Sequence, residues 1–345
     1  MHDARVLVVD DSAAMRALFC DVLEQSKNVR VVGTAANAAE AREQIAQIMP
    51  NVITLDVEMP GMSGIEFLEE IMSGGSPLPV VMLSSLTQSG TDTSLKAFEL
   101  GAVECFPKPL KATPEQFAKT VGKLGKIVLA AANSNVRDKP RNKGAKAASA
   151  AEDFACNGTI AAFSTSMGGV DALSEVLAHY PANCPATVIV LQTEPAVAQA
   201  FIARADKDFA CSVKAVADGA ALVPGTVHIA CDPGKHVIVE PGQPAVLRLV
   251  ERDPVEGFRP SATLLFGTIG RSRIPAIGAV LTGMGEDGAK GLKLLRDAGC
   301  KTLAQDRNTA TVPQAPAAAI EAGAVDCELK LEDLAAAVLS ACKAN

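Results

Sequence analysis

The stretch Thr159-Ile-Ala-Ala-Phe-Ser-Thr-Ser-Met-Gly-Gly-Val-Asp-Ala-Leu173 changes character halfway along its length. It begins as an apolar run typical of a buried strand, and it leads into a helical pattern that places Val170, Leu173 and Leu177 on one face. Three hydroxyl residues and the pair Gly168-Gly169 separate the two parts and favour a tight turn. A strand, a turn and a helix in this order predict an α/β fold.

Ser166 lies where the predicted strand passes into the helix. A hydroxyl at such a turn points out from the edge of a sheet, glycines allow a substrate to approach, and the free N–H groups of the helix can stabilise an oxyanion. Ser166 is therefore a candidate nucleophile. A plain tight turn with a capping serine is the competing interpretation, and geometry alone favours it.

The 345-residue chain is long enough for two domains, and its 48% hydrophobic residues can supply both cores. The net charge of −7, the lack of tryptophan and the single tyrosine argue against nucleic acid as a partner. Nine singly scattered cysteines suit reduced cytosolic thiols better than disulfides or a metal site. Because no apolar run is long enough to cross a bilayer and no signal-peptide pattern is present, we expect a cytoplasmic protein without membrane insertion.

Residues 1–125 alternate between apolar strand patterns and amphipathic helix patterns, as a parallel α/β sheet requires. Five β/α units of this length predict a flavodoxin-like doubly wound domain. The expected strands are residues 5–9, 29–32, 52–55, 80–83 and 104–106, and the expected helices lie near 15–23, 38–48, 64–72, 92–100 and 115–130.

Polar side chains follow these strands at their carboxyl ends, where ligands bind in such sheets. Asp10 and Asp11 follow the first strand, and Asp56 ends the third. Three carboxylates that meet repel one another unless a divalent cation lies among them, and oxygen ligands suit Mg²⁺. Asp56 can then attack a phosphoryl group while Ser84 and Lys108 bind its oxygens. Taken singly, each residue would more often be a strand-end cap.

Four segments resemble the receiver domains of response regulators, and in particular those of the chemotaxis protein-glutamate methylesterases (CheB). They are Val-Val-Asp-Asp-Ser12, Leu-Asp-Val-Glu-Met-Pro-Gly-Met62, Met-Leu-Ser-Ser-Leu-Thr87 and Phe-Pro-Lys-Pro109. The resemblance implies that Asp56 is the acceptor of a phosphoryl group, which such domains take from a histidine kinase. It also implies that Asp10, Asp11, Asp56 and the backbone carbonyl of Glu58 bind Mg²⁺.

The same resemblance implies that Ser84 and Lys108 form the switch pair and that the peptide bond before Pro109 is cis. Cys105 departs from the family, which usually has an aromatic switch residue at this position. We expect phosphorylation to survive this change, whereas the way in which it is transmitted can differ.

Residues 126–156 lose periodicity and gather alanine and basic residues, as in Arg137-Asp-Lys-Pro-Arg-Asn-Lys-Gly-Ala-Lys146. This composition predicts a flexible linker. Such a tether is too soft to transmit strain, so a phosphorylation signal has to pass through contacts between the domains.

Residues 157–345 alternate again and predict a second doubly wound α/β domain with a hairpin insertion. Residues 213–250 are rich in strand patterns separated by Pro-Gly turns. Further strands are expected up to residue 163 and at 187–191, 277–281 and 302–306, and helices after residue 168, at about 196–205, around 292–295 and near 331–343.

This part of the chain resembles the CheB methylesterase domain in Ser166-Met-Gly-Gly, Glu256-Gly-Phe-Arg-Pro-Ser261, Leu281-Thr-Gly-Met-Gly-Glu-Asp-Gly-Ala289 and Ala304-Gln-Asp306. The family hydrolyses methyl esters on glutamates of chemoreceptor cytoplasmic helices and deamidates certain glutamines there, and its hydrolase domain needs no cofactor. The resemblance implies that Ser166 is the nucleophile and Asp287 the acid of a Ser-His-Asp triad. It also implies that the backbone amides of Met167 and Met284 line the oxyanion hole.

The histidine of the family's triad has no counterpart in this sequence. The chain has Gln192-Thr-Glu-Pro195 where the family has Gln-His-Met-Pro. Thr193 cannot take a proton from Ser166 near neutral pH, and losing one triad member typically costs several orders of magnitude in rate. None of the chain's histidines is a natural replacement; they are His2, His179, His228 and His236.

Two hypotheses for the function remain. The first is a phosphorylation-regulated methylesterase and deamidase with an unusual triad, which Ser166 and Asp287 favour. The second is a catalytically silent module that binds receptor helices or the kinase under control of the receiver, which Thr193 favours. A DNA-binding regulator is disfavoured by the α/β pattern and the acidic charge. Three further departures from the family lie at Ser164, Thr263 and Gln314-Ala-Pro316.

Overall fold

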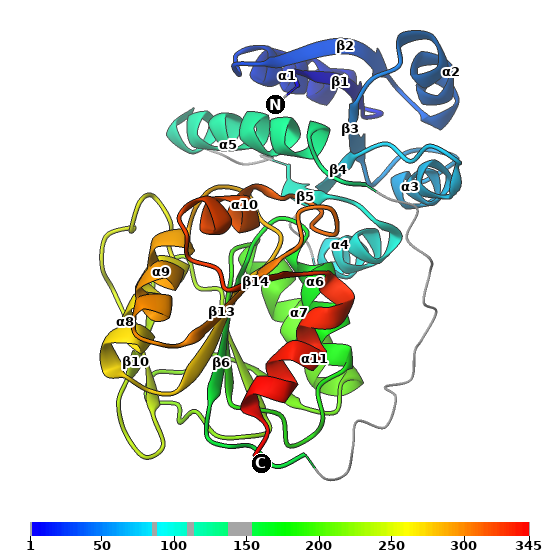
Figure 1. Cartoon of the computed structure of the whole chain (residues 1–345). Coiled ribbons are helices and arrows are strands. Elements are labelled where there is room, and N and C mark those ends of the chain that lie inside the picture. The colour runs from blue at the N-terminus through cyan, green and yellow to red at the C-terminus, as the bar shows by residue number, and fades with distance from the viewer. Residues whose placement is uncertain (1, 85–87, 109–113, 137–153, 345) are drawn as a thin grey trace. The chain divides into compact units, whose positions relative to one another are not determined.

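The computed structural model describes residues 2–84, 88–108, 114–136 and 154–344. The chain divides into two compact units, Met1–Arg141 and Asn142–Asn345, and each contains its own parallel sheet (Figure 1). Pro109 and residues 137–153 of the expected linker lie outside the described residues. Within the described ranges, no helix combines the length and the hydropathy needed to cross a membrane.

The first unit contains a five-stranded parallel sheet in the order β2-β1-β3-β4-β5. Its central strands are apolar and buried, as in Val6, Val8 and Ile53, because helices cover both faces of the sheet. This flavodoxin-like order confirms the predicted fold class. The strands are β1 (Ala4–Val9), β2 (Val29–Ala35), β3 (Val52–Asp56), β4 (Val80–Ser84) and β5 (Glu104–Pro107), and the helices are α1 (Ala13–Glu24), α2 (Ala38–Ile48), α3 (Gly64–Ser73), α4 (Gln88–Leu100) and α5 (Pro114–Ala132).

Helix α5 continues to Ala132, although residue 125 was the expected end of the first domain. Ile127, Val128 and Ala131 are buried, so apolar burial carries the helix into the segment that the composition assigned to the linker. On the other side of the linker, Phe154 is already buried and its backbone oxygen accepts a hydrogen bond from Asn183. Phe154 therefore already belongs to the fold of the second unit.

The second unit contains a seven-stranded parallel sheet in the order β14-β13-β12-β6-β7-β9-β8 and a separate antiparallel hairpin, β10–β11. Its strands are β6 (Ile160–Thr165), β7 (Thr187–Leu191), β8 (Ser212–Ala215), β9 (Thr226–Ala230), β10 (His236–Glu240), β11 (Val246–Val250), β12 (Ala276–Val280), β13 (Lys301–Gln305) and β14 (Cys327–Leu329). Its helices are α6 (Gly169–Ala178), α7 (Pro195–Asp208), α8 (Ala262–Ser272), α9 (Ala289–Asp297), α10 (Gln314–Glu321) and α11 (Leu331–Cys342).

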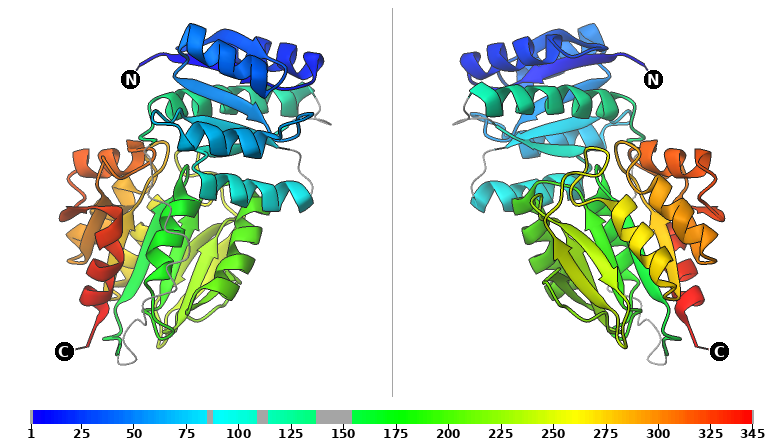
Figure 2. Two further views of the ribbon diagram at one scale, coloured as in Figure 1. Left: turned by 90° about the vertical axis from the view of Figure 1, so that its right-hand side faces the viewer. Right: turned by 90° about the vertical axis from the view of Figure 1, so that its left-hand side faces the viewer.

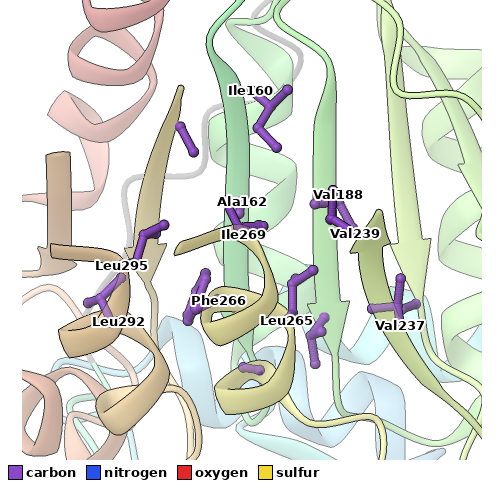
Figure 3. Close-up of a cluster of buried hydrophobic side chains, with 14 of the residues drawn as sticks. Ile160, Ala162, Val188, Val237, Val239, Leu265, Phe266, Ile269, Leu292 and Leu295 are labelled. Atoms are coloured by element: carbon purple, nitrogen blue, oxygen red, sulfur yellow. The ribbon is translucent and has the colours of Figure 1, made fainter. Parts of the chain in front are cut away.

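Two groups of helices enclose this sheet. Helix α6 packs against α7 and α11, whereas α9 packs against α8 and α10, and the two groups lie on opposite faces (Figures 1 and 2). The core beneath α8 and α9 joins the sheet, these helices and the hairpin (Figure 3). Its members include Ile160, Val188, Val237, Val239, Leu265, Phe266, Ile269, Leu292 and Leu295. The second doubly wound α/β domain is therefore also confirmed.

The β-rich middle of the second unit divides between two sheets, which the sequence pattern did not predict. Strands β8 and β9 join the large parallel sheet, and only β10 and β11 form the hairpin. Helix α8 was not predicted either, because Gly267 and Gly270 weaken its helical pattern. A Cβ at Gly270 would lie 3.1 Å from the backbone oxygen of Leu294, so this glycine allows α8 and α9 to approach closely.

Each sheet has one pair of neighbouring strands whose following connections run toward opposite edges of the sheet. In the first unit this pair is β1 and β3, and in the second unit it is β6 and β12. The connections diverge there and leave an opening at the carboxyl ends of the strands, which is where ligands bind in open α/β sheets. Asp10 and Asp56 flank the first opening, and Ser166 and Met284 flank the second.

Gly64 at the start of α3 lies directly against the end of β3. A Cβ at this position would lie 1.8 Å from the backbone oxygen of Asp56. We expect Gly64→Ala to lower the free energy of unfolding of the first unit by roughly 1–3 kcal/mol, because α3 or Asp56 has to move. Urea denaturation followed by circular dichroism measures this change.

Tyr180 supplies an internal reference for this measurement. It is the only tyrosine of a chain without tryptophan, so tyrosine fluorescence reports the second unit alone and its transition should not move. Gly75→Ala is the matched control, because a Cβ there has no neighbour within 4 Å. Equal stability of the two variants would contradict the packing argument.

Candidate functional site

Three carboxylates meet at the opening of the first sheet. Asp10 is fully buried after β1, Asp56 is 2% exposed at the end of β3, and Asp11 is exposed. One oxygen of each lies within 4.8 Å of the other two. Oxygens bound to one Mg²⁺ at about 2.1 Å lie at most about 4.2 Å apart, so a small movement of the exposed Asp11 makes this group fit the ion.

Lys108 lies among these carboxylates. Its Nζ is 2.7 Å from Asp56 Oδ1 and 2.9 Å from Asp10 Oδ2. Burial raises the pKa of the Asp56 carboxyl, and the hydrogen bond and charge of Lys108 offset this only in part. Burial alone would lower the pKa of Lys108, but its two carboxylate partners outweigh that effect and raise it. When ionised, the four groups leave two negative charges, which one divalent cation would neutralise.

The other predicted receiver residues lie around this group. Ser84 ends β4, and its backbone oxygen accepts a hydrogen bond from Lys108 N at 2.8 Å. Glu58 N donates to Asp56 Oδ1 at 3.1 Å, so the backbone of Glu58 lies beside the carboxylates. Cys105 is buried on β5, where its thiol lies 3.7 Å from the backbone oxygen of Ser94 on α4. A small buried thiol thus occupies the position at which an aromatic residue was expected.

Ser166 and Met284 meet at the opening of the second sheet, although they come from different motifs. Ser166 Oγ accepts a hydrogen bond from Met284 N at 2.9 Å. Glycines make this approach feasible, since a Cβ at Gly283 would lie 2.6 Å from Ser166 Oγ, and Gly168 has a φ of +75°. The predicted nucleophile and one predicted oxyanion donor are therefore in contact.

Thr282 ties the loop after β12 to the loop after β6. Its backbone oxygen accepts hydrogen bonds from Ser166 N at 3.2 Å and from Thr165 Oγ1 at 2.7 Å. Its hydroxyl donates to Met167 O at 2.9 Å and accepts from Val312 N at 2.9 Å. Met167 is buried, and its backbone thus lies against this same loop.

Asp287 binds the amino end of helix α8. Its Oδ1 accepts from Ser261 Oγ at 2.9 Å and from Thr263 N at 3.0 Å, and its Oδ2 accepts from Ala262 N at 2.7 Å and from Gln192 Nε2 at 2.7 Å. The carboxylate is 5% exposed, and the positive end of the helix dipole stabilises its charge. Each of its oxygens already has two donors in this structure.

Thr193 is half-buried in the turn between β7 and α7. Within the described part of the chain, no hydrogen bond joins its hydroxyl to Ser166 or Asp287. The neighbouring Gln192 reaches Asp287 instead, and its Nε2 also donates to Pro260 O at 2.7 Å. The structure therefore holds the expected nucleophile and the expected acid without a base between them.

His236 is fully buried near Asp287 but cannot serve as that base. Its Nδ1 accepts a hydrogen bond from Ser261 N at 3.2 Å, so the proton lies on Nε2, which donates to Asp253 O at 3.1 Å. Both nitrogens are thus bound to backbone groups of the segment that precedes α8. His179, at the far end of α6, is exposed and bonds to Glu175 O.

Three further residues of this site lie within or beside the sequence motifs, but the sequence indicates no role for them. Gln192 and Ser261 hold Asp287, and Gln314 Oε1 accepts a hydrogen bond from Gly285 N at 3.1 Å. A polar residue directly after the apolar strand β7 was a signal for Gln192. The partners of all three are distant in the chain, so no local pattern identifies them.

Sequence profiles of two families match the chain. The profile of the response regulator receiver domain matches residues 6–120, and that of the CheB methylesterase matches residues 161–338.

Curated relatives match over the full length. The chain is 42% identical to protein-glutamate methylesterase/protein-glutamine glutaminase 1 of Caulobacter vibrioides, over 100% of both chains. It is 41% identical to the protein-glutamate methylesterase/protein-glutamine glutaminase of Agrobacterium fabrum, over 97% of this chain and 96% of that protein. Among solved structures, it resembles the CheB methylesterase catalytic domain of Thermotoga maritima, with 26% identity, a TM-score of 0.51, and coverage of 53% of this chain and 98% of that one.

Because four donors bind the carboxylate of Asp287, we expect this carboxylate to stabilise the second unit. In Asp287→Asn, the amide NH₂ has to face two N–H or O–H donors, so we expect the free energy of unfolding to fall by roughly 1–3 kcal/mol. Urea denaturation followed by Tyr180 fluorescence measures the loss. Asp297→Asn removes an exposed carboxylate from α9 and is the matched control. A midpoint equal to that of the control would show that the helix contact does not stabilise the fold.

His228 on β9 predicts acid sensitivity of the second unit. Burial lowers its pKa, with a backbone contact to Ala221 opposing and the charge of Lys214 adding to the effect. Below about pH 6.5 the unfolded chain therefore binds a proton that the folded chain does not, and stability falls as the pH falls. We expect His228→Leu to lose less stability than the parent between about pH 7 and 5, measured by Tyr180 fluorescence in urea. His179→Asn, at an exposed histidine, should behave like the parent, and equal losses in all three proteins would refute the assignment.

Proposed function

Because the chain belongs to the CheB family, in which a response regulator receiver domain is joined to a methylesterase domain, we propose that it is a phosphorylation-regulated protein-glutamate methylesterase and protein-glutamine glutaminase of chemotaxis. The proposed substrates are glutamate methyl esters and certain glutamines on the cytoplasmic helices of chemoreceptors. The hydrogen bond between Ser166 Oγ and Met284 N is the observation that carries the proposal, because it joins a nucleophile to an oxyanion donor.

In the first unit, Asp56 takes a phosphoryl group from a histidine kinase. When bound, Mg²⁺ neutralises part of the charge of the phosphoryl oxygens and of the carboxylates around them. Lys108 lies within 2.7 Å of Asp56, so its ammonium group is in place to bind a phosphoryl oxygen, and Ser84 binds another. The residues proposed to hold the ion are Asp10, Asp11, Asp56 and the backbone carbonyl of Glu58.

In the second unit, Ser166 Oγ attacks the carbonyl carbon of the glutamate methyl ester. The carbonyl oxygen gains negative charge and accepts hydrogen bonds from the backbone amides of Met284 and Met167. The ester C–O bond breaks, the leaving oxygen takes up the proton that the Ser166 hydroxyl loses, and methanol departs from an acyl-enzyme. Water then attacks the acyl carbon, releases the glutamate and returns a proton to the serine oxygen. With a glutamine substrate, ammonia leaves in place of methanol.

This reaction needs a general base that accepts the proton of Ser166. Position 193 supplies no base, and Asp287 is bound by four other donors. We therefore expect slow turnover that rests on the oxyanion hole and on substrate binding. A catalytically silent binding module under control of the receiver is the second candidate, and Thr193 is the observation that favours it.

The proposed partners are a histidine kinase, as phosphoryl donor, and the cytoplasmic domain of a chemoreceptor, as substrate. Both interactions place the protein in the cytoplasm. The proposal includes no nucleic-acid partner and no insertion into the membrane.

Methanol release tests the proposal directly. The full chain is incubated with a methylated receptor fragment, with and without Mg²⁺ and a small-molecule phosphoryl donor. We expect release above the buffer rate that is lost in Ser166→Ala and is no longer stimulated in Asp56→Ala. Thr193→His should raise the rate by roughly 10²-fold or more, because it supplies a general base.

Ser174→Ala is the matched control for the nucleophile. It removes another hydroxyl from the same region, one that within the described residues bonds to Val170 O of its own helix and to no other group, and should leave the rate unchanged. Release that persists in Ser166→Ala would exclude Ser166 as the nucleophile. No release by the parent protein, together with release by Thr193→His, would favour the silent module.

A further inference from the structure

Two consecutive backbone N–H groups beside Ser166 donate to side-chain oxygens. Met284 N donates to Ser166 Oγ at 2.9 Å, and Gly285 N donates to Gln314 Oε1 at 3.1 Å. The first partner is the proposed nucleophile. The second is a carboxamide on a flexible side chain, and the mechanism above gives it no part.

The loop of residues 282–285 does not need Gln314 to keep its shape. Gln305 Oε1 accepts from Thr282 N at 2.8 Å. Gly283 N donates to Val312 O at 2.9 Å, and Gly283 O accepts from Ala315 N at 3.0 Å. These bonds join the loop to β13 and to the chain before and within α10, so the bond from Gly285 N to Gln314 is additional to them.

Gln314 is the first residue of α10, and its side chain is half-buried. Solvent therefore reaches part of this side chain. On another side of Gly285 lies Phe258, whose ring carbon Cζ would be 2.8 Å from a Cβ at that glycine. Phe258 and Gln314 thus flank the Gly285 amide, which is next in the chain to the proposed oxyanion donor Met284.

The Gln314 side chain carries the same group as a glutamine substrate, and its carbonyl resembles that of a glutamate methyl ester. We propose that Gly285 N–H is a further binding group for the side-chain carbonyl of the substrate, beside the amides of Met284 and Met167, and that Gln314 occupies it until substrate displaces it. Gln314 is then a residue that sets substrate affinity through internal competition. This inference rests on the proposed function for the identity of the ligand, but it concerns binding and requires no turnover.

The Gly285 amide signal in ¹H–¹⁵N NMR spectra of the full chain tests the inference. The probe is N-acetyl-glutamine N-methylamide, titrated into the parent protein and into Gln314→Ala. We expect the variant to bind the probe about fivefold more tightly, since one competing hydrogen bond is gone, and the Gly285 signal to shift as the probe binds. Gln314→Glu keeps the competing oxygen and should bind no more tightly than the parent.

Gln199→Ala is the matched control, because it removes the same side chain from the exposed surface of α7 in the same unit. Equal affinity of Gln314→Ala and the parent, or a Gly285 signal that does not respond to the probe in any variant, would overturn the inference. Failure of the proposed esterase would appear separately: methanol release would be absent in every variant while the probe still bound as expected.

Discussion

Both candidate sites depend on one constraint of parallel sheets: where neighbouring strands send their connections in opposite directions, the carboxyl ends of the strands stay uncovered. In the first unit this brings Asp10 and Asp56 within reach of Lys108. In the second unit it brings Ser166 to the backbone of Met284. Small residues make the close approach feasible, since Gly283 leaves no room for a side chain beside the serine hydroxyl. The proposed phosphoryl transfer and the proposed ester hydrolysis thus both belong to openings of the same architectural kind.

The two openings handle charge differently. In the first, the carboxylates leave a surplus of negative charge that suits a divalent cation, and Lys108 compensates only part of it. In the second, the carboxylate of Asp287 accepts hydrogen bonds within the fold from the amino end of α8 and from Gln192. A carboxylate held in this way keeps its position without a histidine. The acid of the expected triad therefore also binds the start of α8.

Periodicity predicted the elements of the first unit well, because its strands are continuous apolar runs and its helices are amphipathic. Periodicity predicted helices and strands less well where tertiary packing outweighs the intrinsic helix or strand propensity of the residues. Helix α8 contains Gly270, which its close contact with α9 requires. Strands β8 and β9 have the same local pattern as the hairpin strands, and only their hydrogen-bond partners distinguish the two sheets.

The sequence by itself determined the chemistry that is available: two α/β domains, three carboxylates and a lysine at strand ends, a serine before a glycine pair, and a threonine where the related enzymes have a histidine. Those conclusions rest on residue types and short spacings, which are visible along the chain. Only the tertiary structure decided that Asp287 binds the start of α8, that Gln192 takes the neighbouring contact, and that Gln314 lies on the Gly285 amide. These contacts join residues far apart in the chain, and their hydrogen bonds depend on the relative positions of packed strands and helices.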